Sequence, residues 1–419
     1  MGIFRIGVLP ATGMSSHLER GEAYNMKTLD DINFEGKRVF MRVDFNVPLD
    51  KQGNVRDDLR IRAVLPGIEK VLSAGGKLIL ASHLGRPKGK VVPEYSLKPV
   101  ALYLSKLLGR PVPLAPDCIG DEVRKQVAAL GNGDVLLLEN LRFHAEEEKN
   151  DDGFSRELAA LAEVYVNDGF AVSHRAHASV QGITRHVEVC AAGYQLQNEI
   201  KYFREAMESP KRPLGMVIGG AKVSTKIDLL ENLITKADFL LIGGAMANTF
   251  LKAMGKDVGK SLAEDEHMAT AARFLDKANQ KGVKVYLPVD VVVAPNAESC
   301  GDVQQVPVEK VPADMRILDV GTRTIEIFKS VLKNCPTIVW NGPLGVFESS
   351  PFHKGTFALA EFLGSLDALT VIGGGDSAAA VREAKVDRKV SYVSTGGGAF
   401  LEMLEGKILP GIAALEECS

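Results

Sequence analysis

The chain has 419 residues, of which 46% are hydrophobic and 25% are charged, and its net charge is −3. That length favours two domains, each large enough to bury its own core. The composition lacks the basic excess that is typical of nucleic-acid binding. No apolar run approaches the roughly 20 residues that cross a bilayer, and the N-terminus has no clean signal core, so we expect neither membrane insertion nor export.

Five cysteines are widely scattered, and the sequence contains no CxxC pair. Their odd number and their spacing argue against a disulfide framework or a zinc knuckle, and they favour a reducing, cytoplasmic location. The five are Cys118, Cys190, Cys300, Cys335 and Cys418.

In chain order, short apolar runs, which predict strands, alternate with amphipathic stretches, which predict helices. In the first half the expected strands are residues 38–45, 77–83, 135–140 and 164–168, and the expected helices include 61–76 and 97–109. In the second half the expected strands are residues 216–220, 239–244, 283–290, 316–321, 337–342, 369–375 and 390–395. Continuous apolar strands with helical crossovers predict parallel sheets covered on both faces. We therefore expect an α/β protein with two doubly wound, Rossmann-like parallel-sheet domains.

A helix is expected to join the two domains. Leu196, Ile200, Phe203 and Met207 recur at helical spacing, which places them in one apolar stripe. The segment ESPKRP, residues 208–213, then breaks the helical pattern. We accordingly expect a connecting helix and hinge at 192–213, with domains at 26–191 and 214–400 and a cleft between them.

Apolar strands run into glycines at several points in the second half. In Val371–Ala380, VIGGGDSAAA, three glycines, Asp376 and Ser377 precede an alanine-rich helix start. Such a junction binds anions, because glycine lets the backbone approach a phosphate and the first-turn N–H groups lack intrahelical partners. Asp376 is suited to hold the magnesium of a nucleotide. For this segment alone the alternative is a turn that needs glycine for its dihedral angles. Recurrence at 217–226, 241–246 and 393–400 favours a shared ligand-binding edge.

The expected strand ends of the first half carry arginines and histidines instead, in HLGRP (83–87), ENLRFH (139–144) and SHRAH (173–177). Arginine binds carboxylate or phosphate bidentately, so we expect a second, smaller anion on this domain. Any one of these arginines alone would more often be a surface ion pair. His174 and His177 lack a convincing third ligand nearby, so a metal site there is not favoured.

Two other motifs are rejected. GKDVGKS, residues 255–261, resembles a P-loop but has too short a spacing between its glycines and follows a helical stretch, so we expect a loop. No segment matches GxGxxG after a strand, which removes the main support for a dinucleotide-dependent oxidoreductase.

An ordered set of motifs resembles the phosphoglycerate kinase family. The motifs are RVDFNVP, SHLGRP, LENLRFH, VNDGF followed by HRAH, GGAKVSTK, LPVD, WNGPLGVFE, GGGDS, STGGGAFLE and ILPG, and they extend from about Met26 to the C-terminus. The resemblance implies a cytoplasmic, usually monomeric glycolytic enzyme. Its reaction would be the reversible transfer of the acyl phosphate of 1,3-bisphosphoglycerate to Mg-ADP, giving 3-phosphoglycerate and Mg-ATP. It further implies that residues 401–419 return to the first domain and that residues 1–25 are a dispensable extension.

The family pattern assigns site residues position by position. It puts 3-phosphoglycerate against Asp44, Asn46, Arg60, His83, Arg86, Arg142 and Arg175. It puts the nucleotide against Lys226, Gly321, Glu348, Gly374, Gly375, Asp376 and Ser377, with Mg²⁺ at Asp376. Arg60, Lys222 and the backbone N–H groups of Gly396, Gly397 and Gly398 match positions that act on the transferred phosphoryl group. Two departures, FAVSHRAH for FGTAHRAH and IGGAMANTF for IGGGMAFTF, are expected to affect only local packing.

No residue in this set stands out as a general base, and the implied reaction needs none, because a carboxyl with a pKa near 4 is already ionised at neutral pH. Positioning and charge neutralisation remain, and they require two ligands on different domains to meet by hinge closure. Two alternatives stay open. A non-catalytic nucleotide-binding protein would have no reason to keep Lys222 opposite the arginines, and a dehydrogenase would need a dinucleotide fingerprint.

Overall fold

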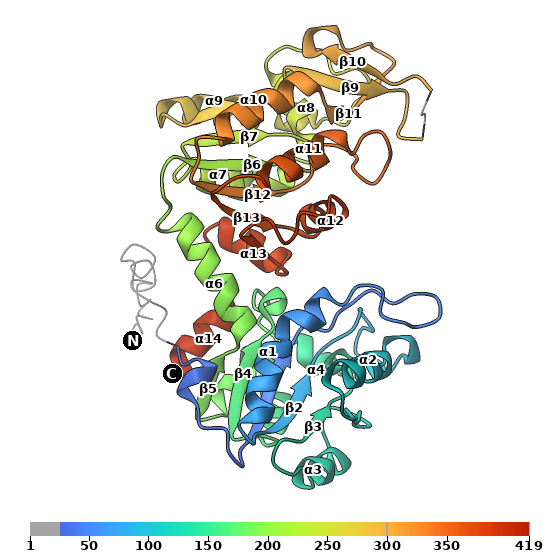
Figure 1. Cartoon of the computed structure of the whole chain (residues 1–419), viewed down its shortest axis with the longest axis vertical. Helices are drawn as coiled ribbons and strands as arrows, with labels where there is room; N and C mark the ends of the chain where they lie inside the picture. The colour runs from blue at the N-terminus through green and yellow to red at the C-terminus, as the bar shows by residue number, and fades with distance from the viewer. Residues whose placement is uncertain (1–25, 299–300, 419) are drawn as a thin grey trace, which may run out of the picture.

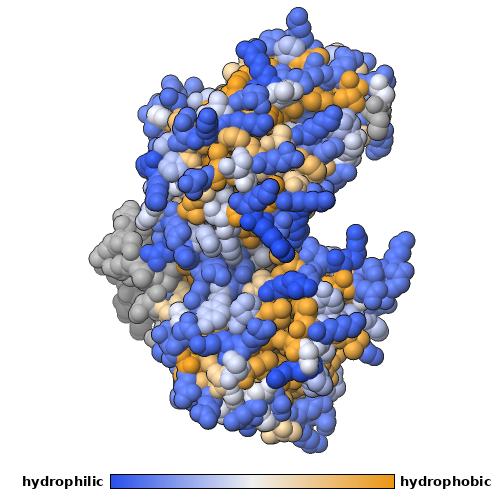
Figure 2. Space-filling model, in the orientation of Figure 1, coloured by the Kyte–Doolittle hydropathy of each residue, from blue (hydrophilic) through white to orange (hydrophobic). Residues whose placement is uncertain are grey.

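The computed structural model describes residues 26–298 and 301–418, so the expected extension at 1–25 lies outside the described residues. Two α/β domains are stacked along the long axis and are joined by helix α6 (Tyr194–Met207) (Figure 1). A deep notch separates the domains on the side away from α6 (Figure 2). The predicted two-domain α/β fold is therefore confirmed.

The N-terminal domain contains a five-stranded sheet in the order β3-β2-β1-β4-β5, and all neighbouring strands are parallel. Side chains alternate between its faces: Val39 and Met41 pack under α1, whereas Phe40 joins the cluster that continues to α6. The strands are β1 (Arg38–Val43), β2 (Lys77–Ala81), β3 (Val135–Leu137), β4 (Val164–Asp168) and β5 (Val189–Ala192). The helices are α1 (Leu59–Ser73), α2 (Lys98–Leu108), α3 (Asp121–Ala128), α4 (Ala145–Glu148) and α5 (Asp152–Ala159). The four predicted strands are confirmed, and β5 was not predicted.

The C-terminal domain contains a six-stranded parallel sheet in the order β14-β13-β12-β6-β7-β8. Its strands are β6 (Leu214–Ile218), β7 (Phe239–Ile242), β8 (Lys284–Tyr286), β12 (Thr337–Asn341), β13 (Leu369–Gly373) and β14 (Tyr392–Val393). The helices are α7 (Ile227–Leu233), α8 (Met246–Ala253), α9 (Met268–Gln280), α10 (Thr322–Leu332), α11 (Lys354–Leu363), α12 (Gly375–Glu383) and α13 (Gly398–Leu404). The last helix, α14 (Pro410–Cys418), packs against β5 of the N-terminal domain. Residues 255–261 form a loop, as predicted.

One predicted strand belongs to a different sheet. Residues 316–321 were expected in the parallel sheet, but β11 (Arg316–Val320) pairs antiparallel with β9 (Asp290–Ala294), which also pairs antiparallel with β10 (Gln304–Pro307). This three-stranded sheet has its own small core, in which Val291 and Val293 pack against Val308 and Met315. An apolar run of five residues fits either kind of pairing, so the sequence alone did not separate the two sheets.

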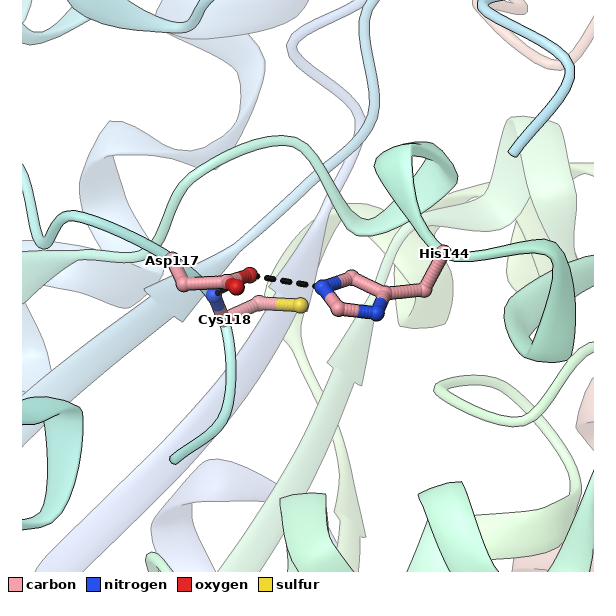
Figure 3. Close-up of side chains that lie close together, drawn as sticks. All are labelled: Asp117, Cys118 and His144. Atoms are coloured by element: carbon pink, nitrogen blue, oxygen red, sulfur yellow. Dashed lines mark hydrogen bonds and ion pairs between the residues drawn. The ribbon is translucent and has the colours of Figure 1, made fainter. Parts of the chain in front are cut away.

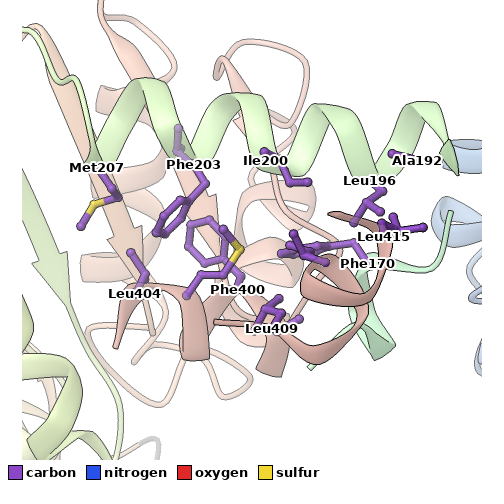
Figure 4. Close-up of a cluster of buried hydrophobic side chains, with 14 of the residues drawn as sticks. Phe170, Ala192, Leu196, Ile200, Phe203, Met207, Phe400, Leu404, Leu409 and Leu415 are labelled. Carbon is purple, nitrogen blue, oxygen red and sulfur yellow. The ribbon is translucent and has the colours of Figure 1, made fainter. Parts of the chain in front are cut away.

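The predicted apolar stripe of α6 is confirmed, since Leu196, Ile200, Phe203 and Met207 are all buried. They face Phe170 of the N-terminal domain and Phe400 and Leu404 of α13, as Figure 4 shows. The core is therefore continuous from one domain to the other along one side of α6.

Two buried carboxyl groups fix α6 to both domains. The Asp168 carboxylate, at the end of β4, accepts hydrogen bonds from the backbone N–H groups of Gln195 (2.8 Å) and Leu196 (3.1 Å) in the first turn of α6. One turn further along, Glu199 accepts a hydrogen bond from the backbone N–H of Thr395 (2.8 Å), in the glycine-rich segment of the C-terminal domain. Burial raises the pKa of both groups, each to about 7.

A disulfide joins Cys190 of β5 to Cys418 at the end of α14, with the two Cα atoms 5.8 Å apart. The scattered cysteines had argued against a disulfide framework, and this single bridge between residues far apart in sequence was not anticipated. Among the described residues, Cys118 and Cys335 are free and buried. Within the same part of the chain, no helix combines the length and apolarity needed to span a bilayer.

The raised pKa of Glu199 predicts a pH-dependent stability. The folded protein keeps this proton at pH values where the unfolded chain has lost it, so the stabilising contribution is full below about pH 4.5 and is lost as the pH rises to about 7. A pKa near 7 instead of 4.5 corresponds to at most about 3 kcal/mol. Glu199→Gln should therefore flatten the fall in unfolding free energy between these pH values, measured by urea denaturation. Glu205→Gln, on the exposed face of the same helix, is the control and should leave the slope unchanged.

Candidate functional site

A cavity lies at the carboxyl ends of the N-terminal sheet. Asp44 follows β1, His83 follows β2, Arg142 follows β3 and Arg175 follows β4, so parallel strand direction alone brings them to one edge. We call it the arginine cavity. It is lined by Asp44, Asn46, Arg60, His83, Gly85, Arg86, Arg142, Ala171, Val172, His174, Arg175 and Gly396 to Gly398. All seven residues expected to contact the smaller anion are in this lining.

Arg60 is held in the arginine cavity by a short network. Its Nη1 lies 2.8 Å from Asp44 Oδ2 and donates to the Asn46 backbone carbonyl at 2.9 Å. The Asn46 side chain in turn accepts a hydrogen bond from the backbone N–H of Gly85 (2.9 Å). Arg60, in the first turn of α1, is thus oriented by groups that follow β1 and β2.

Arg142 is largely buried and belongs to the short helix η3 (Leu141–Phe143). Its Nη1 donates to the Gly85 carbonyl at 3.0 Å, and the adjoining segment is braced by His144, whose Nε2 lies 2.7 Å from Asp117 Oδ1. Figure 3 shows this pair with Cys118 beside it. The hydrogen bond raises the pKa of His144, whereas burial keeps the pKa of the Cys118 thiol well above its ordinary value. The cluster therefore supports the Arg142 segment, with its thiol protonated.

Three histidines near these arginines, His83, His174 and His177, are uncharged at neutral pH. Burial and neighbouring arginines lower the pKa of His174 to about 4 and that of His177 to about 3, and they lower the pKa of His83 well below 6.5. His174 lines the cavity, whereas His177 faces Glu147, with Nδ1 3.8 Å from Oε1. The positive charge in the cavity therefore comes from arginines.

The C-terminal domain contributes a glycine loop to the same cavity. Gly396 and Gly397 precede α13, Gly398 begins it, and the three lie over the segment from Phe170 to Arg175. Alanine would not fit at position 396, because its Cβ would be 2.1 Å from Cε1 of Phe170. Glycine here permits a close contact between the domains.

A second cavity lies at the carboxyl ends of the C-terminal sheet, and we call it the glycine cavity. It is lined by Gly220, Ala221, Gly244, Ala245, Ala247, Asn248, Pro288, Val291, Ile317 to Val320, Pro343 to Val346, Glu348 and Asp376. The small antiparallel sheet supplies one wall through β9 and β11. Of the residues expected to contact a nucleotide, Glu348 and Asp376 are in this lining.

Other expected nucleotide residues gather around Asn341, at the end of β12. The Lys226 Nζ donates to Asn341 Oδ1 (2.8 Å) and to the Gly219 carbonyl (2.6 Å), and burial lowers the pKa of Lys226 to about 8. Gly374, with φ of +93°, and Gly375 begin α12 next to Asn341. Ser377 is buried and accepts a hydrogen bond from the backbone N–H of Gly342 (2.6 Å).

Two further expected residues lie apart from both cavity linings and from the group around Asn341. Lys222 is exposed in the loop that follows β6. Gly321 precedes α10, whose first N–H groups at Arg323 (3.1 Å) and Thr324 (2.7 Å) are already bonded to the buried Asp290 carboxylate. The first turn of α10 is thus occupied by a protein side chain in this structure.

Sequence reasoning missed several lining or supporting residues. Asn341 stands within the quoted motif WNGPLGVFE but received no role, although it bonds Lys226 and the Gly373 carbonyl (3.1 Å). Asp319 lines the glycine cavity, and burial raises its pKa to about 7. Ala245 and Asn248, which were expected to matter only for local packing, also line that cavity. In the sequence these two positions could have been found, because they are where IGGAMANTF departs from the family pattern.

One domain has an arginine-lined cavity, and the other domain contributes a glycine loop to it and has a glycine-rich cavity of its own. This arrangement is that of a two-domain α/β phosphotransferase. Comparison with known proteins agrees. The sequence profile of the family described as phosphoglycerate kinase matches residues 29–407. The chain belongs to the phosphoglycerate kinase family.

Individual relatives support that membership. The phosphoglycerate kinase of Syntrophobacter fumaroxidans is 74% identical over 94% of this chain and 99% of its own length. That of Geobacter metallireducens is 54% identical over the same shares. Among solved structures, phosphoglycerate kinase from Coxiella burnetii superposes with a TM-score of 0.86 at 42% identity, covering 94% of this chain and 99% of its own. The Pyrococcus horikoshii enzyme gives a TM-score of 0.80 at 32% identity over the same shares.

The contact between Gly396 and Phe170 generates a steric prediction. Gly396→Ala should lower kcat by on the order of tenfold or more, because the glycine loop must move away from the arginine cavity. Gly301→Ala is the control, since its Cβ would meet nothing within 4 Å. Steady-state kinetics and melting temperatures of both variants decide the matter. A Gly396→Ala enzyme with wild-type kcat would show that the close contact is not needed.

Proposed function

We propose that this protein is a monomeric, cytoplasmic enzyme that transfers the acyl phosphate of 1,3-bisphosphoglycerate reversibly to Mg-ADP, giving 3-phosphoglycerate and Mg-ATP. The observation that carries the proposal is the arginine cavity, in which all seven expected side chains meet a glycine loop from the opposite domain. Family membership supports the same reaction.

The arginine cavity is suited to 3-phosphoglycerate. Arg60, Arg86, Arg142 and Arg175 offer bidentate donors to a phosphate and a carboxylate. The neutral histidines can donate hydrogen bonds without adding charge. The substrate carboxylate is already ionised at neutral pH and attacks without a base. Toward the attacking carboxylate, the chain's own residues therefore only have to orient it and exclude water.

The glycine cavity is suited to the nucleotide. Its apolar wall, from Val291 and Ile317, can hold a base, and Glu348 can accept hydrogen bonds from ribose hydroxyls. The backbone N–H groups at the start of α12, which carries Asp376 of this lining, are suited to bind phosphates. Asp376 and phosphate oxygens form the hard oxygen donor set that Mg²⁺ prefers, and the ion would neutralise charge between the phosphates.

During transfer, negative charge spreads over the equatorial oxygens of the phosphoryl group. We assign the neutralisation of that charge to Arg60, Lys222 and the N–H groups of Gly397 and Gly398. Lys222 is exposed and lies outside both linings. Its role therefore depends on closure of the two domains, with hinges in the connector at 192–213 and in the segment after Leu401.

Purified protein is expected to phosphorylate 3-phosphoglycerate with ATP only when a divalent metal is present. An assay coupled to consumption of 1,3-bisphosphoglycerate measures this direction, and an assay coupled to formation of ATP measures the reverse direction, each with excess EDTA as the metal-free arm. Full activity in EDTA would contradict the metal assignment. Absence of turnover with Mg²⁺ would contradict the proposed reaction.

Arg60→Ala and Lys222→Ala should each lower kcat by on the order of 10³-fold, because both charges act when the phosphoryl group lies between its partners. Their melting temperatures should change little, since neither side chain belongs to the core. Arg60→Lys should recover little activity, because a point charge cannot replace a planar fork. Arg62→Ala is the matched control on α1, where Arg62 pairs with Asp58 (2.6 Å) outside the cavity. A kcat within about tenfold of wild type would remove that residue from the catalytic set.

Closure should be largest when both ligands are bound, because either ligand alone contacts mainly one domain and has little preference for the closed state. Small-angle X-ray scattering measures this. We expect 3-phosphoglycerate with a non-reacting Mg-nucleotide analogue to shrink the radius of gyration more than either does alone. An unchanged radius at saturation of both sites would mean that no hinge closure occurs.

A further inference from the structure

The Cys190–Cys418 bridge joins two segments that both bear on the arginine cavity. We propose that this cysteine pair is a reversible thiol–disulfide modification site, which locks α14 onto the N-terminal sheet and thereby steadies the cavity wall at Ser173–Arg175. The partner in the exchange is a dithiol or disulfide, of low molecular mass or on a redox protein. The link to substrate binding rests on the proposed function, whereas the bridge itself does not.

The two cysteines occupy positions suited to exchange. Cys190 is fully buried in the edge strand β5, three residues before Gly193, where the backbone turns into α6. Cys418 ends α14 and is partly exposed. Cys418 is therefore the more accessible residue of the pair, and we expect an attacking thiolate to act on its sulfur rather than on that of Cys190.

Helix α14 supports a wall of the arginine cavity from behind. Leu409, Ile412 and Leu415 are buried in the core that includes Leu196 of α6 and Phe170. Figure 4 shows Leu415 next to Leu196 and Phe170, and Leu409 in the same cluster on the side of Phe400. The backbone N–H of Gly411 donates to the Ser173 carbonyl at 2.8 Å.

The fit at Gly411 is tight. A Cβ at that position would lie 2.7 Å from Cγ1 of Val180 and 3.0 Å from Cα of Ser173. Ser173 directly precedes His174 and Arg175, which line the cavity. Movement of α14 away from the sheet would therefore release the backbone that carries both side chains.

The bridge holds the end of α14 that is farthest from Gly411. The helix has nine residues, and isolated helices shorter than about 12 residues are marginal in water. Without the bridge, the last turn of α14 loses its covalent link to β5, and we expect it to fray more readily. Among the described residues Cys118 and Cys335 are free and buried, and Cys300 lies outside the described residues.

The exchange needs only two reactants, the protein disulfide and one dithiol. A dithiol thiolate attacks the Cys418 sulfur, the S–S bond breaks, and Cys190 leaves as a thiolate that takes a proton. The second thiolate of the dithiol then attacks its own mixed-disulfide sulfur and releases Cys418. One dithiol is oxidised to a disulfide as one protein disulfide is reduced to two thiols. Formation is the reverse reaction, in which a disulfide is the oxidant.

The first experiment establishes the bridge. The full chain is equilibrated in buffers of oxidised and reduced glutathione and quenched in acid. It is then denatured and alkylated with iodoacetamide, and the masses of its peptides are measured by mass spectrometry. Cys190 and Cys418 should be protected together and become alkylated together as the reduced fraction rises, whereas Cys118 and Cys335 should be alkylated throughout. Cys300→Ser should not change this pattern. Alkylation of Cys418 at every buffer composition, or pairing of Cys418 with Cys300, would overturn the proposal.

The second experiment tests the lock. Hydrogen exchange of residues 410–418 should be on the order of tenfold slower in the oxidised protein than after reduction by dithiothreitol. Cys418→Ser should behave like the reduced protein in either buffer, and Cys335→Ser should behave like wild type. Equal exchange in the oxidised and reduced forms would overturn the lock.

The third measurement links the lock to the cavity. The KM for 3-phosphoglycerate should rise about two- to fivefold on reduction, with kcat and the KM for ATP unchanged, because only the cavity wall is loosened. An unchanged KM alongside altered hydrogen exchange would overturn this link. A protein that shows the bridge and the lock but no turnover in either redox state would instead contradict the proposed function.

Discussion

Both domains are built onto one side of α6, and the relation between the two cavities follows from that packing. The helix has 14 residues, so it is a rod of about 21 Å. Asp168 binds its first turn to β4, and Glu199 binds the glycine-rich segment at Thr395. The core along its apolar stripe is continuous with both sheets. Because a packed helix does not bend easily, movement of one domain against the other must take place at the ends of the rod.

The charge distribution in the arginine cavity works against stability in the unliganded protein. Arg42 is completely buried and donates to Ser179 (2.9 Å), while the Glu147 carboxyl beneath it has a pKa raised by burial. His83 and His177 stay neutral because burial disfavours their charged form and, in addition, because their protonation would add charge to a region already crowded with guanidinium groups. A bound anion relieves the repulsion between the guanidinium groups. The same repulsion therefore lowers the stability of the unliganded protein and favours binding of a small polyanion.

The sequence could predict features that depend on residues close together in the chain better than features that depend on contacts between distant segments. Strand ends rich in glycine or arginine could be assigned to one edge of each sheet, because parallel strands share a direction. The seven side chains lining the arginine cavity were identified through family motifs rather than through periodicity. The antiparallel sheet of β9, β10 and β11, the Cys190–Cys418 bridge and the Asp290 cap of α10 all depend on pairing between distant segments, which leaves no local pattern. Asn341 was quoted but not assigned, since its two hydrogen bonds reach Lys226 and β13 only in the folded chain.

The domains also meet through an ion pair that limits what the protein alone can contribute to closure. Arg382, in the last turn of α12, lies 3.1 Å from Asp57, just before α1. It thus joins the helix that begins at the glycine cavity to the helix that carries Arg60. Both side chains are about one-third exposed, and such pairs contribute about 0–1 kcal/mol. That energy can guide the approach of the domains but cannot hold them together. The remainder must come from ligands that contact both domains at once, which makes closure depend on the presence of both substrates.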